Sequence, residues 1–202
     1  DQPIIPNWQM SLVWVMMAGF LTLIGSAWLQ QYHPDAMALD SDLLRESVLY
    51  MALPMMLALG LASEARRRMA AYFGVDIGHV VPLAFPIMSP SWPFGLAGVL
   101  SQRRPDLLLI PHRRALAMIE FTAPLVLFST GTLLTLLGLH LTPLEPPELS
   151  SAPIAFQNNP LITILALDWL GDSLLVKLQW IHLTGLTGIG LTLLGWTLLL
   201  PI

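Results

Sequence analysis

The stretch LLRESVLYMALPMMLALGLASEARRR, residues 43–68, decides how this chain folds. Apart from Arg45, Glu46 and Ser47 near its start, it is predominantly apolar as far as Ser63. Its length suits the roughly 20 apolar residues that a helix needs to cross a bilayer. Ser41 or Asp42 is expected to cap the helix, and Pro54 predicts a kink within it. The stretch therefore predicts a membrane-spanning helix from about Leu43 to Arg68, with a charged end.

The composition of the whole chain agrees with a membrane environment. The 202 residues are 55% hydrophobic and only 11% charged, whereas soluble domains average roughly 25% charged residues. A chain of this composition cannot cover its surface with polar groups, so lipid is its expected solvent. The absence of cysteine excludes disulfides, thiolate metal sites and a cysteine nucleophile. The formal net charge of -4 argues against a nucleic-acid partner.

Three further apolar stretches are long enough to be spans: Trp8–Leu29, Ala115–Leu141 and Leu178–Leu200. We therefore predict an all-α polytopic membrane protein with about four transmembrane helices. Residues 1–42 form an extra N-terminal helix and an acidic loop, and residues 43–202 form the membrane core. Gly185, Gly188, Gly190 and Gly195 give the last span a smooth face for close helix packing.

The segment from Asp76 to Arg113 is apolar but carries too many prolines for a continuous helix. It predicts a Pro-rich re-entrant or β-hairpin segment between helices two and three, with short strands at Val80–Phe85 and Gly98–Leu100. Leu161–Leu175 is interpreted as an interfacial helix, because it is short and contains two aspartates.

Arginines gather between spans two and three, and acidic residues gather in the loops on the other side. The positive-inside rule then places the arginine-rich loop and both termini in the cytoplasm or stroma.

Residues 63–67 read Ser-Glu-Ala-Arg-Arg, where a zinc hydrolase would carry His-Glu-x-x-His. That motif works because two histidines one helical turn apart share a face, and the glutamate takes the proton of the zinc-bound water. Ser63 is a poor zinc ligand, and Arg67 is always cationic. We therefore predict no metal here, and we expect Glu64 to form an ion pair with Arg67 or Arg68.

Other polar residues offer weaker signals. His182, near the start of the last span, is the best-placed candidate to ligate a chlorophyll magnesium, and the alternative is an interfacial histidine bonded to a carbonyl. The other histidines (His33, His79, His112 and His140) are scattered. Glu120 is an acid inside a span and needs a partner, for which Arg113, Arg114 or Arg67 is expected.

Several motifs follow residues 63–67 in a fixed order: Pro93-Phe94-Gly95-Leu96-Ala97-Gly98, Ile110-Pro111-His112-Arg113-Arg114, Phe121-Thr122-Ala123-Pro124, Pro153-Ile154-Ala155-Phe156-Gln157, Ile181-His182 and Leu198-Leu199-Leu200-Pro201. In order and spacing the chain from about Leu44 to Ile202 resembles the site-2 protease family of intramembrane zinc metalloproteases, in its cyanobacterial and chloroplast branch. The first span is an addition to that core.

The departures from the family concern its active site. Ser63 and Arg67 replace both histidines, Leu198 replaces the asparagine of the last motif, and Ala123 replaces a glycine. The third ligand, an aspartate, would lie beyond Ile202. The resemblance therefore implies a degenerate pseudoprotease without enzymatic activity. It implies no zinc, and it leaves chlorophyll and lipid open as ligands.

For function, the resemblance implies a structural or assembly subunit of a larger membrane complex. The family branch suggests a photosynthetic membrane, cyanobacterial thylakoid or plasma membrane, with a photosystem or an electron-transport complex as partner besides membrane lipids. Three alternatives stay open: a pseudoprotease that shields transmembrane client segments, a pigment-binding accessory subunit, and an enzyme with a relocated site.

Overall fold

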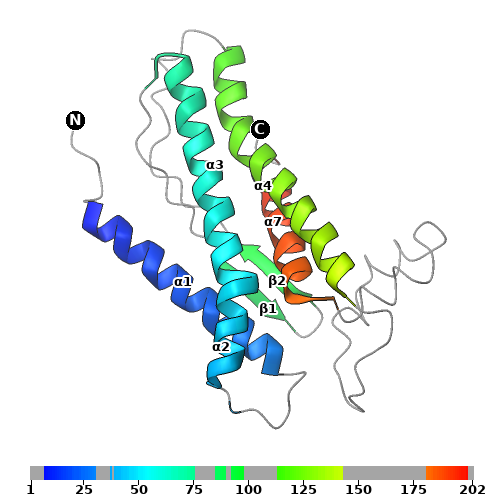
Figure 1. Cartoon of the computed structure of the whole chain (residues 1–202). Helices are drawn as coiled ribbons and strands as arrows, with labels where there is room; N and C mark the ends of the chain where they lie inside the picture. Colours follow the sequence, from blue (N-terminus) through cyan, green and yellow to red (C-terminus); the bar gives the residue numbers. More distant parts are fainter. Residues whose placement is uncertain are drawn as a thin grey trace, which may run out of the picture.

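The computed structural model describes residues 7–30, 37, 39–75, 85–89, 92–97, 113–142 and 181–199. The elements are α1 (Asn7–Gln30), α2 (Ser41–Ser47), η1 (Val48–Ala52), α3 (Leu53–Tyr72), β1 (Phe85–Ser89), β2 (Trp92–Ala97), α4 (Arg113–Leu141) and α7 (Leu183–Leu199). Figure 1 shows that α2, η1 and α3 join into one long helix, beside which α4 and α7 pack. Helices thus lie at all four predicted apolar stretches.

Two of these helices are long and apolar enough to cross a membrane, Ser41–Tyr72 and Arg113–Leu141, by their length and composition. The apolar parts of the other two are shorter, at Trp14–Gln30 and Leu183–Trp196. The described structure therefore contains two candidate spans of the four that the sequence predicts.

The long helix begins with a cap that differs from the predicted one. The side chain of Asp40 accepts a hydrogen bond of 2.9 Å from the backbone amide of Asp42. Neither Ser41 nor Asp42 is the capping residue, because both already lie inside the first turn. Asp40 has the extended backbone that an N-cap requires, with φ -63° and ψ 134°.

Pro54 does not act alone in disturbing this helix, because a π-helical turn, η1, directly precedes it. In an α-helix the amide of residue 54 would donate to the carbonyl of Tyr50, and proline has no amide hydrogen. The wider turn shifts the hydrogen-bond pattern, as the amide of Leu53 donates to the carbonyl of Val48. A π-turn thus accommodates the proline within a continuous helix.

Helices α4 and α7 pack so closely that their backbones touch at glycines. A side chain added at Gly138 would overlap the backbone of Gly185, and one added at Gly188 would overlap the backbone of α4 at Gly131. The smooth face predicted for α7 is confirmed at Gly185, Gly188 and Gly195. The two glycines of α4 that complete the contact were not predicted.

The main core lies between these helices. Its fully buried members come from α1 (Leu21), from the long helix (Met51, Met55 and Leu59), from α4 (Leu127) and from α7 (Leu186, Leu191 and Leu194). The outward faces of α1, α3 and α4 nevertheless keep many large hydrophobic side chains exposed. The molecule therefore has an apolar interior and an apolar exterior.

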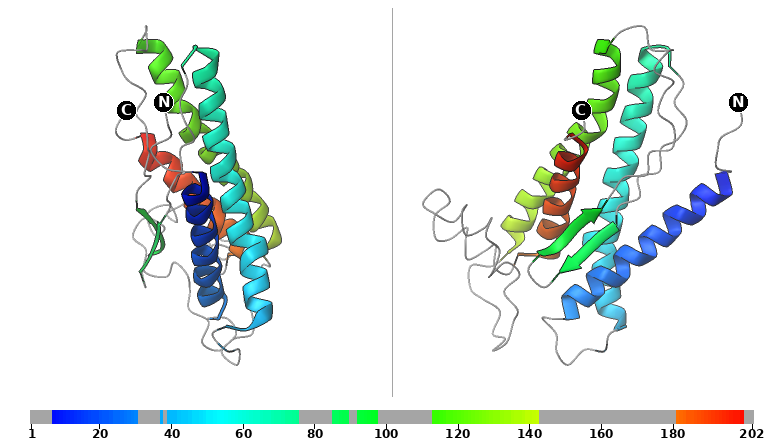
Figure 2. Two further views of the ribbon diagram at one scale, coloured as in Figure 1. Left: turned by 90° about the vertical axis from the view of Figure 1, so that its left-hand side faces the viewer. Right: turned by 180° about the vertical axis from the view of Figure 1, so that it is seen from behind.

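Strands β1 and β2 pair antiparallel, with Phe85 opposite Ala97 and Ile87 opposite Gly95. Figure 2 shows the pair beside the helices, outside the plane of α3 and α4, where β2 contacts α7. Apart from Phe85, which begins β1, the predicted strand ranges Val80–Phe85 and Gly98–Leu100 lie outside the described residues, and the prediction did not include the rest of β1 or β2. The predicted helix Leu161–Leu175 lies outside the described residues.

Candidate functional site

Ser63 and Arg67, the positions compared above with the histidines of a zinc motif, share one face of α3. Ser63 and Arg67 are one helical turn apart, as the motif requires. Their side chains cannot do what histidines would do. The side chain of Arg67 is 45% exposed and turns to an ion pair with Glu64. Ser63 and Arg67 therefore have the helical spacing of two zinc-binding histidines but not side chains that bind zinc.

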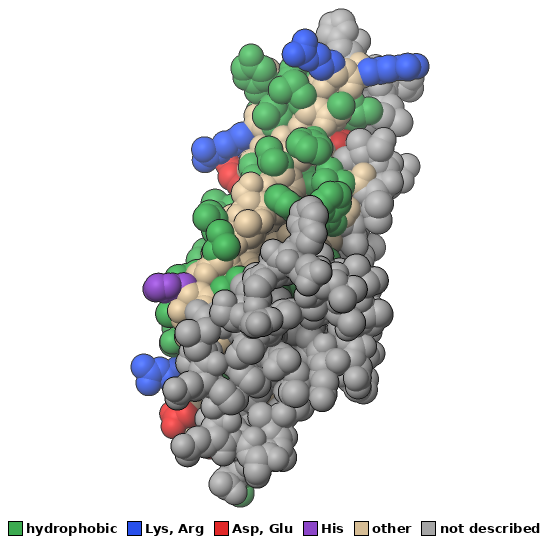
Figure 3. Space-filling view, turned by 90° about the vertical axis from the view of Figure 1, so that its right-hand side faces the viewer, with side chains coloured by type: hydrophobic (Ala, Val, Ile, Leu, Met, Phe, Trp, Pro, Cys, Tyr) green, Lys and Arg blue, Asp and Glu red, His purple; other side chains and the backbone are tan. Residues whose placement is uncertain are grey.

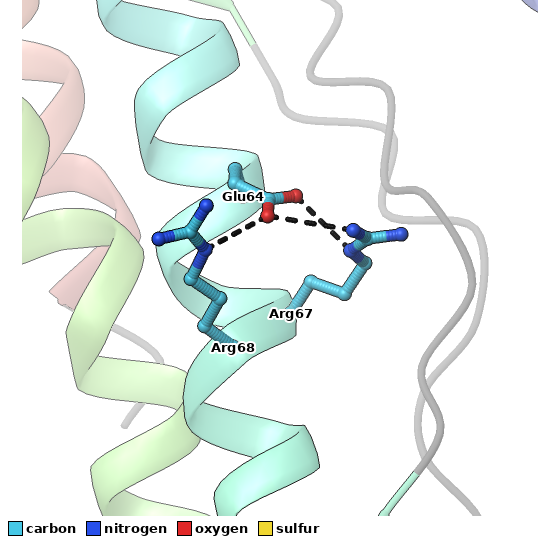
Figure 4. Close-up of polar contacts among 3 residues, drawn as sticks. All are labelled: Glu64, Arg67 and Arg68. Carbon is cyan, nitrogen blue, oxygen red and sulfur yellow. Dashed lines mark hydrogen bonds and ion pairs between the residues drawn. The ribbon is translucent and has the colours of Figure 1, made fainter.

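The carboxylate of Glu64 is held by the two arginines that follow it. Its Oε2 lies 3.0 Å from Nε of Arg67, and its Oε1 accepts a hydrogen bond of 2.9 Å from Nε of Arg68. Figure 4 shows the carboxylate between the two guanidinium groups. The predicted ion pair is confirmed, with both arginines taking part. Both oxygens of the Glu64 carboxylate are thus engaged by cations of its own helix.

Arg66 forms the most buried ion pair of the described residues. Its Nη2 donates to Oε1 of Glu120 on α4 over 2.5 Å, and its side chain is 7% exposed against 36% for Glu120. The predicted partners of Glu120 (Arg113, Arg114 and Arg67) were wrong. Arg66 continues a buried stripe of residues four apart, Ala58, Ala62 and Ala70. That spacing places it on the face that packs against α4, and it was the signal in the sequence that could have identified the pair.

His182 caps the start of α7. Its Nδ1 accepts a hydrogen bond of 3.2 Å from the backbone amide of Thr184 and lies 3.1 Å from the hydroxyl of Thr184. Its own amide donates to the hydroxyl of Thr142 at the end of α4. The partners are thus an amide and hydroxyls, not the carbonyl that the alternative reading expected. A neutral imidazole that accepts at Nδ1 carries its proton at Nε2, the nitrogen otherwise free to bind a metal.

The π-turn and the start of α7 meet at a polar junction. The ring of Tyr50 packs edge-on against the imidazole of His182, with centroids 4.8 Å apart. The hydroxyl of Thr187 lies 2.9 Å from the carbonyl oxygen of Tyr50 and 3.0 Å from that of Leu183. Sequence reasoning missed this junction, because its residues are more than 130 positions apart and carry no motif.

Leu198 and Ala123, the other two positions that differ from the pattern the sequence resembles, take part in packing. Leu198, in the last turn of α7, and Ala123, in α4, are both partly buried against the main core. Close approach near Ala123 comes from the opposite helix, because a side chain at Gly195 would lie 3.0 Å from the carbonyl oxygen of Pro124. A hydrocarbon side chain at position 198 can neither ligate a metal nor donate a hydrogen bond.

Among the residues that the structure describes, no group of three or more histidine, aspartate and glutamate side chains is placed to hold a metal ion. His33, His79 and His112 lie outside the described residues, so the prediction about their scatter is untested. His140 and His182 belong to the same end of the bundle, at the end of α4 and the start of α7.

Comparison of the chain with protein-family models, with curated proteins and with solved structures gave no match.

Proposed function

We propose that this protein is a catalytically inactive, site-2-protease-like integral membrane protein that serves as a structural or assembly subunit of a larger membrane complex. The observation that carries the proposal is the state of Glu64. The only acid of the degenerate motif is held by Arg67 and Arg68, and Arg67 occupies a position where the motif needs a ligand. A carboxylate engaged in this way has no metal-bound water to activate.

Integration into a bilayer is supported by the surface of the two candidate spans. Only 33% of the apolar window of Ser41–Tyr72 and 22% of that of Arg113–Leu141 is buried inside the protein. A core helix of a soluble protein would be mostly buried, so the low burial of these two windows supports an apolar surrounding. On α4 the hydroxyls of Thr122, Ser129 and Thr132 donate to carbonyls one turn earlier. Such internal hydrogen bonds suit a surface that lacks water.

A role as a subunit follows from what the fold provides. The bundle is tied together internally by the glycine contact of α4 and α7 and by the Arg66–Glu120 pair. It presents rows of exposed leucines, such as Leu53, Leu57 and Leu61 on α3. A rigid apolar surface without a functioning site suits packing against other transmembrane helices. The photosynthetic setting of such a complex rests on the family resemblance alone.

Metal analysis tests the inactive state. We expect the purified full chain to hold no stoichiometric zinc and to cleave no transmembrane peptide in zinc-containing buffer. The variant Glu64→Gln provides the matched control, since it removes the only acid of the motif and keeps the side-chain shape. Stoichiometric zinc in the wild type, or cleavage that Glu64→Gln abolishes, would refute the proposal.

Purification from native membranes in mild detergent tests the role as a subunit. We expect a discrete assembly that contains other integral membrane proteins in fixed ratio. Paired variants then locate the contact: Leu57→Ala with Leu61→Ala on α3, and Leu133→Ala with Leu136→Ala on α4, all at exposed positions. We expect one pair to release the partners and the other to leave them bound. A monomeric chain with no co-purifying protein would contradict this role.

The strand pair favours a second function, the shielding of transmembrane client segments. A two-stranded sheet leaves an outer edge on each strand without a strand partner among the described residues, and an extended segment can pair with such an edge. Photocrosslinking from Phe94 or Leu96 separates the two functions. Capture of varied client segments favours shielding, and capture of the stable subunits alone favours the structural role.

A further inference from the structure

Two arginines at the start of α4 differ from the three near the end of α3. Arg66, Arg67 and Arg68 each form an ion pair with a carboxylate. Arg113 and Arg114 are exposed, and none of the ion pairs among the described residues includes them. The amide groups of the first turn of α4 add a further partial positive charge. Among the described residues, this end of the helix therefore carries positive charge that no carboxylate pairs with.

The side chains that follow Arg114 on the same stripe of α4 are apolar and exposed. Spacings of four, three and four residues lead from Arg114 to Met118, Phe121 and Leu125, and such spacings keep side chains on one helix face. The three apolar residues are 41%, 46% and 50% exposed. Figure 3 shows cationic side chains at the upper end of this side of the molecule with hydrophobic ones directly below them, and further cationic side chains along its left edge.

The positions of these residues along α4 match the headgroup layer and the acyl-chain layer of a bilayer. Residues 47–63 of the long helix and residues 121–139 of α4 contain no charged side chain. At 1.5 Å per residue these stretches are roughly 26 Å and roughly 29 Å long, close to the ~30 Å of a hydrocarbon core. The Arg66–Glu120 pair keeps the two stretches level at one end. Arg114 then lies about 9 Å beyond Glu120, in the headgroup layer.

We propose that Arg113 and Arg114, with the stripe of Met118, Phe121 and Leu125 beneath them, form a binding site for an anionic phospholipid. The headgroup phosphate binds the two guanidinium groups, which bind phosphate strongly, and an anionic headgroup carries no choline cation to repel them. The acyl chain lies along the apolar stripe. This proposal rests on the proposed placement of the chain in a membrane. It adds a preference for negatively charged lipids.

Native mass spectrometry of the full chain in mild detergent tests the proposal. The probes are phosphatidylglycerol and phosphatidylcholine with identical acyl chains, in equal amounts. We expect wild-type protein to retain phosphatidylglycerol preferentially. Arg114→Gln should lower this preference on the order of fivefold, and Arg113→Gln together with Arg114→Gln on the order of 25-fold, from about 1 kcal/mol per arginine. Arg45→Gln removes the same charge at the opposite end and should change the preference by less than about twofold.

Each other outcome has a definite meaning. Equal retention of both lipids by the wild type, an unchanged preference in the double variant, or an equal loss in Arg45→Gln would overturn the site. Displacement of the lipid by inorganic phosphate at equal concentration would show that the arginines bind phosphate alone, against the proposed lipid. Insertion into vesicles of pure phosphatidylcholine separates the two proposals: failure there contradicts the membrane placement, whereas insertion without a preference contradicts only the lipid site.

Discussion

The hydroxyl of Thr187 on α7 donates to the backbone carbonyl of Tyr50, at the place in the long helix where Pro54 supplies no amide hydrogen. A side chain from one helix thus contacts the backbone of another at its irregular turn. In a bilayer such a hydrogen bond from a neighbouring helix matters, because no water is present to bond a backbone carbonyl that lacks a donor in its own helix. The π-turn and the docking of α7 are therefore parts of one arrangement.

Replacement of this hydroxyl should loosen the junction. Thr187→Val keeps the shape of the side chain and removes the donor, so we expect a loss of about 1 kcal/mol in the free energy of unfolding. Thermal unfolding in detergent measures it. Thr130→Val is the control, because the hydroxyl of Thr130 bonds only within its own helix. In the background of Pro54→Ala, where an amide hydrogen is restored, Thr187→Val should cost less. Equal losses in the free energy of unfolding in both backgrounds would show that Pro54 and the Thr187 hydrogen bond act independently.

The sequence predicted where the described helices lie, because long apolar stretches bounded by polar residues favour helices. All four stretches are helical, and the Glu64 ion pair followed from residues on one helix. The contacts between helices were not predicted correctly. The pairing of Arg66 with Glu120 depends on which face of α3 meets α4, and charge alone made Arg67 an equal candidate.

The described strands Phe85–Ser89 and Trp92–Ala97 were not predicted at those positions, for a related reason. Pro86 and Pro93 lie inside the described strands, although proline usually marks the end of a strand. A two-stranded pair has outer edges, where a missing amide hydrogen breaks no ladder. Which edge is free depends on the pairing, and pairing is a property of the folded chain that local sequence does not carry.

The Arg66–Glu120 pair should contribute to the stability of the bundle. Arg66→Ala leaves Glu120 without its cation, and we expect a loss of about 2 kcal/mol, below the value for a fully buried pair because Glu120 is partly exposed. Adding Glu120→Gln should recover part of this loss, since the unpaired charge disappears. Arg67→Ala serves as the comparison at an exposed position. Chemical unfolding in detergent gives the values, and equal effects of the two arginine variants would contradict a special role for Arg66.

The contact between α4 and α7 leaves no room for a methyl group. Gly138→Ala and Gly188→Ala place a carbon atom against the backbone of the other helix, which cannot move aside as a flexible side chain would. We expect each to cost at least about 2 kcal/mol through separation of the helices. Gly60→Ala is the matched control, since nothing lies within 4 Å of the added carbon. It should be neutral or stabilising by about 0.5 kcal/mol, through helix propensity. A small cost at Gly138 would mean that the helices pack less closely than described.

The roles of His182 as a helix cap and as a pigment ligand lead to different results for one pair of variants. His182→Asn retains a side chain that can accept from the amide of Thr184, so the cap predicts stability near that of the wild type. His182→Ala removes the acceptor and should cost about 1 kcal/mol. A pigment ligand predicts that the absorption of any bound chlorophyll is altered in both variants alike. Thermal unfolding and the absorption spectrum of each purified variant decide between them. We expect Asn to behave as wild type, because the acceptor at Nδ1 already binds an amide and the neutral ring then keeps its proton at Nε2.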